Sequence, residues 1–354
     1  MLKIVKKAEA SPLQQSLLRL GAALAALCAA AVIMAIMGFN PLEVYGKMLE
    51  GSLKTAYRFK ETVNKTIPLV VLSLGIAVAF KMKFWNIGAE GQFYLGAMGA
   101  SFIAFNFSSL PAVVLLPFMM IASILCGGLW ALVPGILKSH FGASESLVTL
   151  MMNYIAIKWV SYLQYGPWKD PKASGFPKMP TFVDAAQLPK IFGVHIGWII
   201  SLVLVAGVYI LFKYSKLGYE IGVLGESETT ARYAGMNVNR IMVVAVILSG
   251  GLCGLAGMMQ ASAIERSLSD ALSGGLGFTA IITTWLARLS PPAIVLVSFA
   301  FAILLQGGAF LQTAMQIPSS VADILQGVIL FFVLSSEFFT QYKIVLANKA
   351  KEVA

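Results

Sequence analysis

The chain has 354 residues, of which 58% are hydrophobic and only 12% are charged, whereas soluble domains have roughly 45 to 50% and about 25%. This composition excludes a soluble globular protein. The net charge of +10 would suit nucleic-acid binding, but the basic residues lie in segments between apolar runs, where they act as topology signals. We therefore predict an all-α polytopic membrane protein that is surrounded by lipid and has no nucleic acid partner.

Ten apolar runs are long enough to cross a hydrocarbon core of ~30 Å. Glycine or proline interrupts several of them, for example at Pro68 and Pro134, so we expect some helices to be broken or re-entrant. We predict about ten transmembrane helices that form a single domain over residues 1–354. The runs cover residues 17–37, 66–82, 88–107, 111–136, 144–163, 195–212, 240–260, 273–289, 291–313 and 321–339.

Lysine and arginine are enriched in short cytoplasmic segments of membrane proteins. With both termini in the cytoplasm, more than half of these residues would lie inside, in part in the tails 1–16 and 340–354 and in the loop 213–239. The run after the basic N-terminus is too long for a signal peptide and lacks a small-residue cleavage site, so we expect a retained first helix. Residues 164–194 contain five prolines and are predicted to form an irregular loop, either a stiff linker or a contact for an external partner.

The sequence contains no nucleotide-binding P-loop, no zinc-protease HExxH and no hydrolase GxSxG motif. The three cysteines lie inside apolar runs, and the two histidines are 55 residues apart. We therefore predict no enzymatic activity and no metal or cofactor bound by this chain. If ATP drives its activity, another subunit binds the ATP.

Four polar residues are predicted to lie at membrane depth. Asn86, Glu90 and Gln92 stand between two apolar runs, and Asn153 lies inside a later one. Polar groups at this depth are costly and commonly face a cavity or the bundle interior. The four are candidates for contact with a solute. The alternative is that they bond to other helices or to free backbone groups of a broken helix.

The polar stretch from Lys213 to Arg240 is longer than a simple connection needs. After Gly225, the segment 226–234 is predicted to form a short helix with Glu226 near its N-terminus and Arg232 towards its C-terminus, ended by Gly235. Such a helix is suited to docking in a groove of another protein. The candidate docking residues are Gly225, Glu226, Ser227, Ala231, Arg232, Tyr233 and Gly235.

Four runs resemble, in order, permease subunits of bacterial ATP-binding cassette (ABC) importers of the ribose and nucleoside type. The runs are FWNIGAEGQ from Phe84, LVTLMMNYIA from Leu147, the loop 218–238, and SGGLCGLAG from Ser249. The resemblance covers roughly residues 60–340 and is strongest to the nucleoside branch. It departs from the family pattern after residue 281, where Trp285 and Arg288 would narrow whatever that helix lines.

The resemblance implies a location in the bacterial inner membrane and several partners. These are a separate ATPase subunit that uses ATP and Mg, a second permease of different sequence, and an extracytoplasmic solute-binding lipoprotein of the basic-membrane-protein type. It also implies that the loop 218–235 holds the coupling helix seated in the ATPase. The expected function is nucleoside import. The alternatives are a ribose-type sugar permease and, in another class, an ion-coupled secondary transporter with Glu90 as its ion site.

Overall fold

The computed structural model describes residues 2–6, 12–173, 175–316 and 342–346, together with positions 324, 327, 328 and 331. It divides into two compact units, one made of Met1–Phe59 with Ile303–Ala354 and the other of Lys60–Ala302. The boundaries fall inside two long helices, α3 (Ala56–Lys81) and α12 (Pro291–Met315). The single domain expected over residues 1–354 stays a prediction, and each unit is described by itself.

In the first unit, α1 (Pro12–Ile36) and α2 (Pro41–Leu53) form a sharply bent pair with an angle of 116° between them. The bend is encoded at Asn40, whose side chain accepts a hydrogen bond from the N–H of Leu42 at 3.1 Å and so starts α2. Pro41, the first helical residue, has no N–H to leave unpaired. Such a bent pair is a broken span or a re-entrant loop, but breaks were expected at other positions.

The tails predicted at 1–16 and 340–354 each contain a strand. Strand β1 (Leu2–Lys6) pairs antiparallel with β4 (Tyr342–Leu346), with Leu2 opposite Leu346. Apart from these strands and one short hairpin, the described chain is helical. The all-α membrane fold is therefore confirmed.

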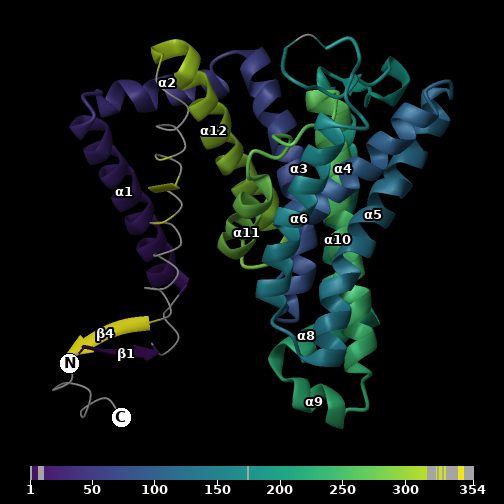
Figure 1. Cartoon of the computed structure of the whole chain (residues 1–354). Coiled ribbons are helices and arrows are strands. Elements are labelled where there is room, and N and C mark those ends of the chain that lie inside the picture. Colours follow the sequence, from purple (N-terminus) through teal and green to yellow (C-terminus); the bar gives the residue numbers. More distant parts are fainter. Residues whose placement is uncertain are drawn as a thin grey trace. The chain divides into compact units, whose positions relative to one another are not determined.

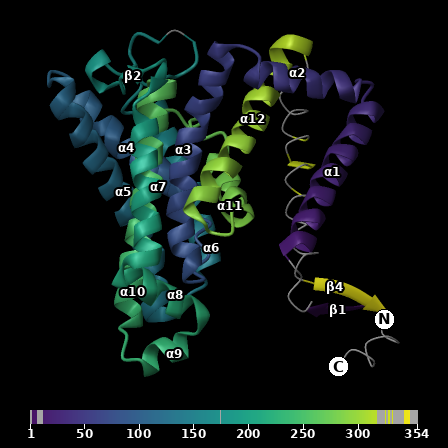
Figure 2. The same cartoon turned by 180° about the vertical axis from the view of Figure 1, so that it is seen from behind.

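The second unit holds the rest of α3 and most of the remaining helices (Figures 1 and 2). Its irregular segment between α6 and α7, which was predicted from the prolines, contains a 3-10 turn and a two-strand hairpin with Lys190 opposite His195. The elements after α3 are α4 (Ala89–Asn106), α5 (Ala112–Phe141), α6 (Glu145–Tyr165), η1 (Asp184–Ala186), β2 (Lys190–Ile191), β3 (Val194–His195), α7 (Gly197–Tyr214), α8 (Lys216–Glu226), α9 (Glu228–Tyr233), α10 (Val238–Met259), η2 (Gln260–Glu265), α11 (Leu276–Leu286) and the first part of α12.

Nine of the ten predicted apolar runs coincide with a helix, namely α1, α3, α4, α5, α6, α7, α10, α11 and α12. The tenth, 321–339, lies largely outside the described residues. Among the described residues, five helices are long and apolar enough to cross a membrane, namely α3, α5, α7, α10 with η2, and α12. The bent pair of α1 and α2 would be a sixth if it counts as one span. The count of about ten spans stays a prediction. The breaks expected at Pro68 and Pro134 are absent, because α3 and α5 continue through these prolines.

The core of the second unit is the packing of α4, α5 and α10 at glycines. A Cβ atom on Gly96 of α4 would overlap the backbone of Gly254, and one on Gly127 of α5 would overlap the backbone of Gly250. Backbones approach this closely only where side chains are missing. The cluster from Ser249 to Gly257 is therefore a packing face for neighbouring helices.

Candidate functional site: a buried polar cluster and an exposed helical hairpin

Asn86 organises a small polar network at the break between α3 and α4. Its Nδ2 donates to Gln92 Oε1 at 2.9 Å and to Ser249 Oγ of α10 at 3.0 Å, while Gln92 Nε2 donates back to Asn86 Oδ1 at 2.9 Å. The N–H of Gly88 also donates to Asn86 Oδ1. All three side chains are buried. Because each polar group has a partner, the network fixes the turn that leads into α4.

Asn153 ties α6 to the same turn. Its Nδ2 donates to the carbonyl oxygen of Ile87 at 2.8 Å, and its Oδ1 accepts from the N–H of Gly91 at 2.8 Å. Both backbone groups lie at the start of α4, where helices leave unpaired N–H groups. Asn153 thus gives hydrogen-bond partners to backbone groups that lack a helical partner where α4 begins.

Glu90 caps the N-terminus of α11. Its Oε2 accepts from the N–H of Gly277 at 2.7 Å, and the side chain of Ser273 and the backbone of Gly275 also hydrogen-bond to the carboxylate. The residue before α11 is Gly275, which has no side chain for capping. A carboxylate at this position also complements the positive end of the helix dipole.

The structure thus gathers all four predicted polar residues into one region and buries them, with at most 3% of any of them exposed. Their hydrogen bonds match the alternative in which they bond to backbone groups and to other helices. Direct contact with a solute stays a prediction, and it requires the helices around these residues to separate.

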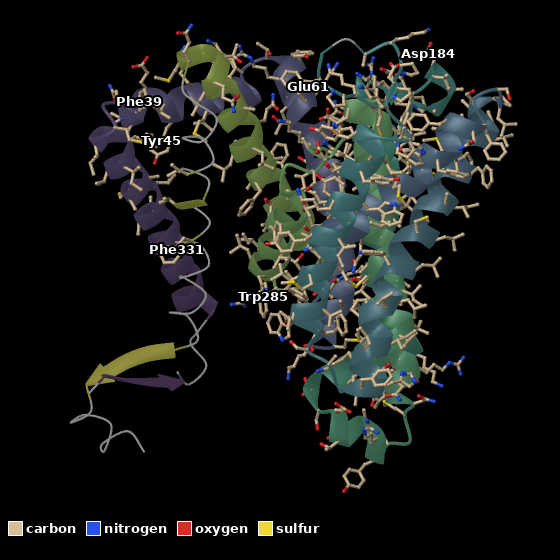
Figure 3. The ribbon with its side chains drawn as sticks, in the orientation of Figure 1. Phe39, Tyr45, Glu61, Asp184, Trp285 and Phe331 are labelled. Atoms are coloured by element: carbon tan, nitrogen blue, oxygen red, sulfur yellow. The ribbon has the colours of Figure 1, made fainter. Side chains whose placement is uncertain are left out.

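An aromatic cluster holds the other end of α11. The indole of Trp285, labelled in Figure 3, stacks on that of Trp85 with ring centroids 5.3 Å apart, and Phe80 lies tilted against both. The narrowing of a solute route by Trp285 and Arg288 stays a prediction.

The polar loop after α7 is a helical hairpin formed by α8 and α9. Helix α8 was missed, although its signal is present in the sequence. Ser215 caps it by accepting from the N–H of Gly218 at 2.9 Å. Leu217, Ile221 and Leu224 follow at helical spacing, and the last two are buried.

The predicted short helix exists as α9, but its boundary needs a correction. Glu226 is the last residue of α8, and the acidic residue in the first turn of α9 is Glu228. The physical reason is Ser227, whose extended backbone separates the helices and whose side chain accepts from the N–H of Thr230 at 3.2 Å. Glu228 also forms an ion pair with Arg232 at 2.7 Å.

One side of the hairpin packs against the end of α3, and the other side is exposed. Gly225 lies so close to the end of α3 that a Cβ atom there would overlap the carbonyl oxygen of Lys81, and Ala231 is fully buried. Tyr233, by contrast, is 94% exposed. Gly235 ends α9 with a φ of +73°, a left-handed conformation that favours glycine. The exposed side of α9 is therefore presented on a rigid support.

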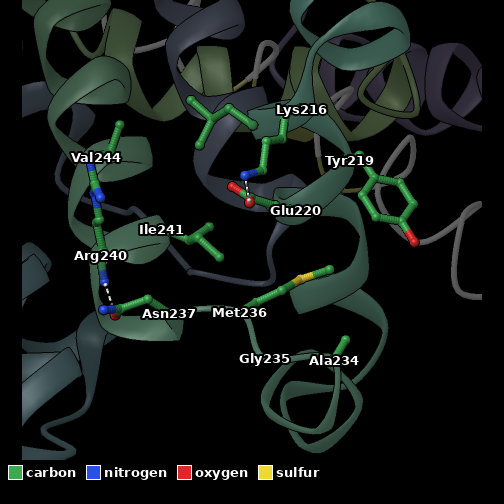
Figure 4. A pocket seen from close by; sticks show the side chains of 11 residues that line it. Lys216, Tyr219, Glu220, Ala234, Gly235, Met236, Asn237, Arg240, Ile241 and Val244 are labelled. Carbon is green, nitrogen blue, oxygen red and sulfur yellow. Dashed lines mark hydrogen bonds and ion pairs between the residues drawn. The ribbon is translucent and has the colours of Figure 1, made fainter.

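A hollow of about 660 Å³ lies beside the hairpin, between α8 and the start of α10 (Figure 4). Lys216 and Glu220 form an ion pair in it at 3.7 Å, and Arg240 lines it from α10. Apolar side chains, among them Met236 and Ile241, complete the lining. The hairpin and this hollow together make a surface of mixed charge and apolar groups, which is suited to another protein.

Comparison with known proteins gives a consistent family match. The family model described as branched-chain amino acid transport system / permease component matches residues 59–334. The glucose ABC transporter permease protein TsgB13 of Haloferax volcanii is 31% identical over 92% of this chain and 88% of its own length. The guanosine ABC transporter permease protein NupP of Bacillus subtilis is 29% identical over 88% and 90%. The nucleoside ABC transporter permease protein NupB of Lactococcus lactis is 27% identical over 86% of each chain.

Proposed function

The chain belongs to the branched-chain amino acid transport system / permease component family, and we propose that it is the membrane permease of an ATP-driven nucleoside importer. Relatives named as guanosine and nucleoside permeases, each matched over most of both chains, support this solute class. The chain itself performs no bond chemistry. ATP and Mg are used by a partner ATPase subunit.

A sugar is the second candidate solute, because the relative from Haloferax volcanii is named as a glucose permease. Uptake of radiolabelled guanosine and glucose into cells with this chain deleted and then restored separates the two. Restored guanosine uptake that excess unlabelled glucose leaves unchanged supports the proposal. Restored glucose uptake without guanosine uptake contradicts it.

The hairpin of α8 and α9 is the observation that carries the proposed coupling to the ATPase. It combines a fixed base, where Gly225 meets Lys81, with a protruding helix whose Tyr233 is almost fully exposed. Only four residues separate α9 from α10, so displacement of α9 acts directly on the core of the second unit. The docking residues are those of the hairpin, with Glu228 added to the predicted set.

The mechanism we propose is alternating access. ATP-driven closure of the partner displaces the hairpin, and α10 passes this displacement to α4 and α5, against which it packs at glycines. A partner shifts such an equilibrium only through contacts that differ between its two states. In this mechanism the differing contacts are those of the hairpin with the ATPase.

The proposal includes further partners and an orientation. A second permease of different sequence completes the solute route, and an extracytoplasmic solute-binding lipoprotein delivers the solute. Both termini and the hairpin face the cytoplasm of a bacterial cell, and the irregular segment between α6 and α7 faces outwards. Figure 2 supports this arrangement within the second unit, because β2 and α9 lie at opposite ends of it.

Site-directed cross-linking tests this coupling. The variant Tyr233→Cys, treated with a thiol cross-linker in membranes, should give a product that contains the ATPase subunit. The matched control is Phe192→Cys, which changes an aromatic residue that is 85% exposed in the hairpin of β2 and β3. Cross-linking of the control to the ATPase, with none for Tyr233→Cys, would contradict the assignment of the loop.

The ion-coupled alternative needs Glu90 as a free ion site. Its carboxylate is instead engaged by the first turn of α11, which favours the ATP-driven mechanism. Uptake in vesicles that hold this chain without an ATPase, driven by an ion gradient, would establish the alternative.

A further inference from the structure

Helix α6 has two chemically different faces. Its inner face packs on α4 and carries the buried residues Thr149, Met152, Asn153, Ala156, Val160 and Gln164. Lys158 lies at the centre of the opposite face, which is exposed. Tyr154 and Tyr162 stand four residues before and after it, and residues at this spacing are neighbours along one side of a helix. The outward face therefore presents a cation between two phenol rings.

This face is unsuited to contact with lipid. At 1.5 Å per residue the 21-residue helix is about 31 Å long and places Lys158 about 20 Å from its start and about 10 Å from its end. A charge that faces hydrocarbon at the centre of a spanning helix costs at least ~2.5 kcal/mol. Lys158 bears part of this cost, because its side chain must extend along the helix to reach the membrane surface. Within the described part of the chain, Lys158 has no ion-pair partner.

The apolarity of the helices supports the same conclusion. Helices α5 and α7 also expose long outward faces, and both are apolar enough to count as membrane spans. Helix α6 is longer than α7, yet it does not reach that apolarity. Part of this lower apolarity comes from the buried residues Asn153 and Gln164. On the exposed face the polar contribution comes from Lys158 and from the hydroxyl groups of Tyr154 and Tyr162.

The outward face also holds a hollow of about 720 Å³, lined by Tyr154, Ile155, Lys158, Trp159 and Tyr162. The hollow is open to the outside because one helix alone lines it. Apolar and aromatic side chains with a few polar groups are typical of a wall of a small-molecule site, and a second wall is needed to enclose a ligand. Aromatic walls favour a flat ring because rings stack. The ammonium group only donates hydrogen bonds, so it suits an acceptor edge such as the O6 and N7 atoms of guanine, which lysine recognises in nucleic acids.

We propose that the outward face of α6 lines the solute route and that Lys158, Tyr154 and Tyr162 form a subsite for the planar, hydrogen-bond-accepting ring of a nucleobase. This inference rests on the proposed function and names the part of the solute that this chain recognises. The ring lies against the aromatic side chains, and the ammonium group of Lys158 donates to its acceptor edge. Because all the lining residues belong to one helix, the second permease supplies the opposite wall.

Thiol labelling tests whether this face is in contact with water. In cells that hold the assembled transporter, a charged thiol reagent should modify the variant Lys158→Cys above the background given by the native cysteines. The matched control is Leu129→Cys, which lies near the middle of α5 and is 61% exposed there. Lys158→Cys that reacts no more than this control overturns the proposal.

Protection by solute tests the ligand class. Guanosine at saturating concentration should slow the labelling of Lys158→Cys, whereas glucose should not. If the native chain imports glucose and not guanosine, the proposed function fails and the nucleobase subsite fails with it. Labelling of Lys158→Cys then still shows whether the face of α6 borders the route.

Uptake measurements test the role of the lysine. The loss of one charge-assisted hydrogen bond lowers affinity by about tenfold or more, so Lys158→Met should reduce guanosine uptake at low concentration by about that factor, and Lys158→Arg should keep more of it. The chain level and the amount of copurified ATPase should stay unchanged. Native uptake by Lys158→Met would show that the lysine only extends towards the membrane surface. Loss of the second permease on purification would show a subunit contact instead. Either result overturns the proposal.

Discussion

Replacement of Glu90 separates its two interpretations, a cap of α11 or a contact for solute. In the structure its carboxylate accepts from Gly277 at 2.7 Å and also bonds to Ser273 and Gly275. A hydrogen bond to a charged group contributes about 1.5–3 kcal/mol, and a buried donor left without a partner costs about 1–3 kcal/mol. Glu90→Ala should therefore lower the free energy of unfolding by at least about 3 kcal/mol. Glu90→Gln keeps one acceptor oxygen and should cost about half as much.

Thermal unfolding of the purified transporter measures this effect. For a chain of 354 residues, 1 kcal/mol corresponds to roughly 1–2 °C, so Glu90→Ala should lower the apparent Tm by roughly 4 °C or more. The control is Glu43→Gln, which removes an exposed acidic side chain from the first turn of α2. There the dipole interaction contributes only about 0.3–1 kcal/mol.

Guanosine uptake by the same variants completes the test. If Glu90 acts as a cap, the uptake that remains should follow the amount of folded transporter in each variant. The cap interpretation is refuted if Glu90→Gln melts like the native chain while its uptake falls about tenfold. That result would place the carboxylate in contact with the solute.

Three further predictions concern other parts of the second unit. Gly254→Val should destabilise the chain by about 1–3 kcal/mol because the added side chain overlaps neighbouring backbone, whereas the control Gly207→Ala, which has open space around it, should melt no lower than the native chain. Ser227→Ala removes the cap of α9, worth about 1 kcal/mol, and should accelerate hydrogen exchange at the N–H of Thr230 about fivefold by mass spectrometry; unchanged exchange would contradict the capping role. Burial lowers the pKa of His195 from 6.5 to about 4. Between these two pH values His195 is protonated in the unfolded chain but not in the folded one. The free energy of unfolding should therefore drop by up to about 3 kcal/mol between pH 6.5 and 4. If the Tm of a His195→Gln variant changes between pH 7.5 and pH 5 by as much as the Tm of the native chain does, this histidine is excluded as the cause.

Local patterns in the sequence were sufficient to predict most of the helices. Apolar runs such as 291–313 have the length of a helix in the structure, because burial and membrane thickness both act on contiguous residues. Helix α2 and helix α8 were missed because neither contains an apolar run of spanning length. The short helix predicted from residue 226 begins instead at Glu228, because Ser227 caps it.

The hydrogen-bond partners within the polar cluster could not be predicted from the sequence. Asn86 and Ser249 are 163 positions apart, and Glu90 and Gly277 are 187 apart, so no local spacing indicates which of them meet. Residue type alone predicted that Asn86 and Glu90 would need partners at membrane depth. Only the packing of α4 against α10 and α11 shows which groups supply them.

The glycine packing described for Gly96, Gly127 and Gly254 has a mechanical consequence. Where the backbones of two helices touch at glycines, neither helix can slide or rotate against the other without steric overlap. We therefore expect α4, α5 and α10 to move together as one rigid body. Helix α10 has 22 residues and is about 33 Å long. A displacement of α9 is therefore expected to move the opposite end of this rigid group of helices by a similar amount. The bending that opens and shuts the passage is then expected at looser joints, such as the segment between η2 and α11.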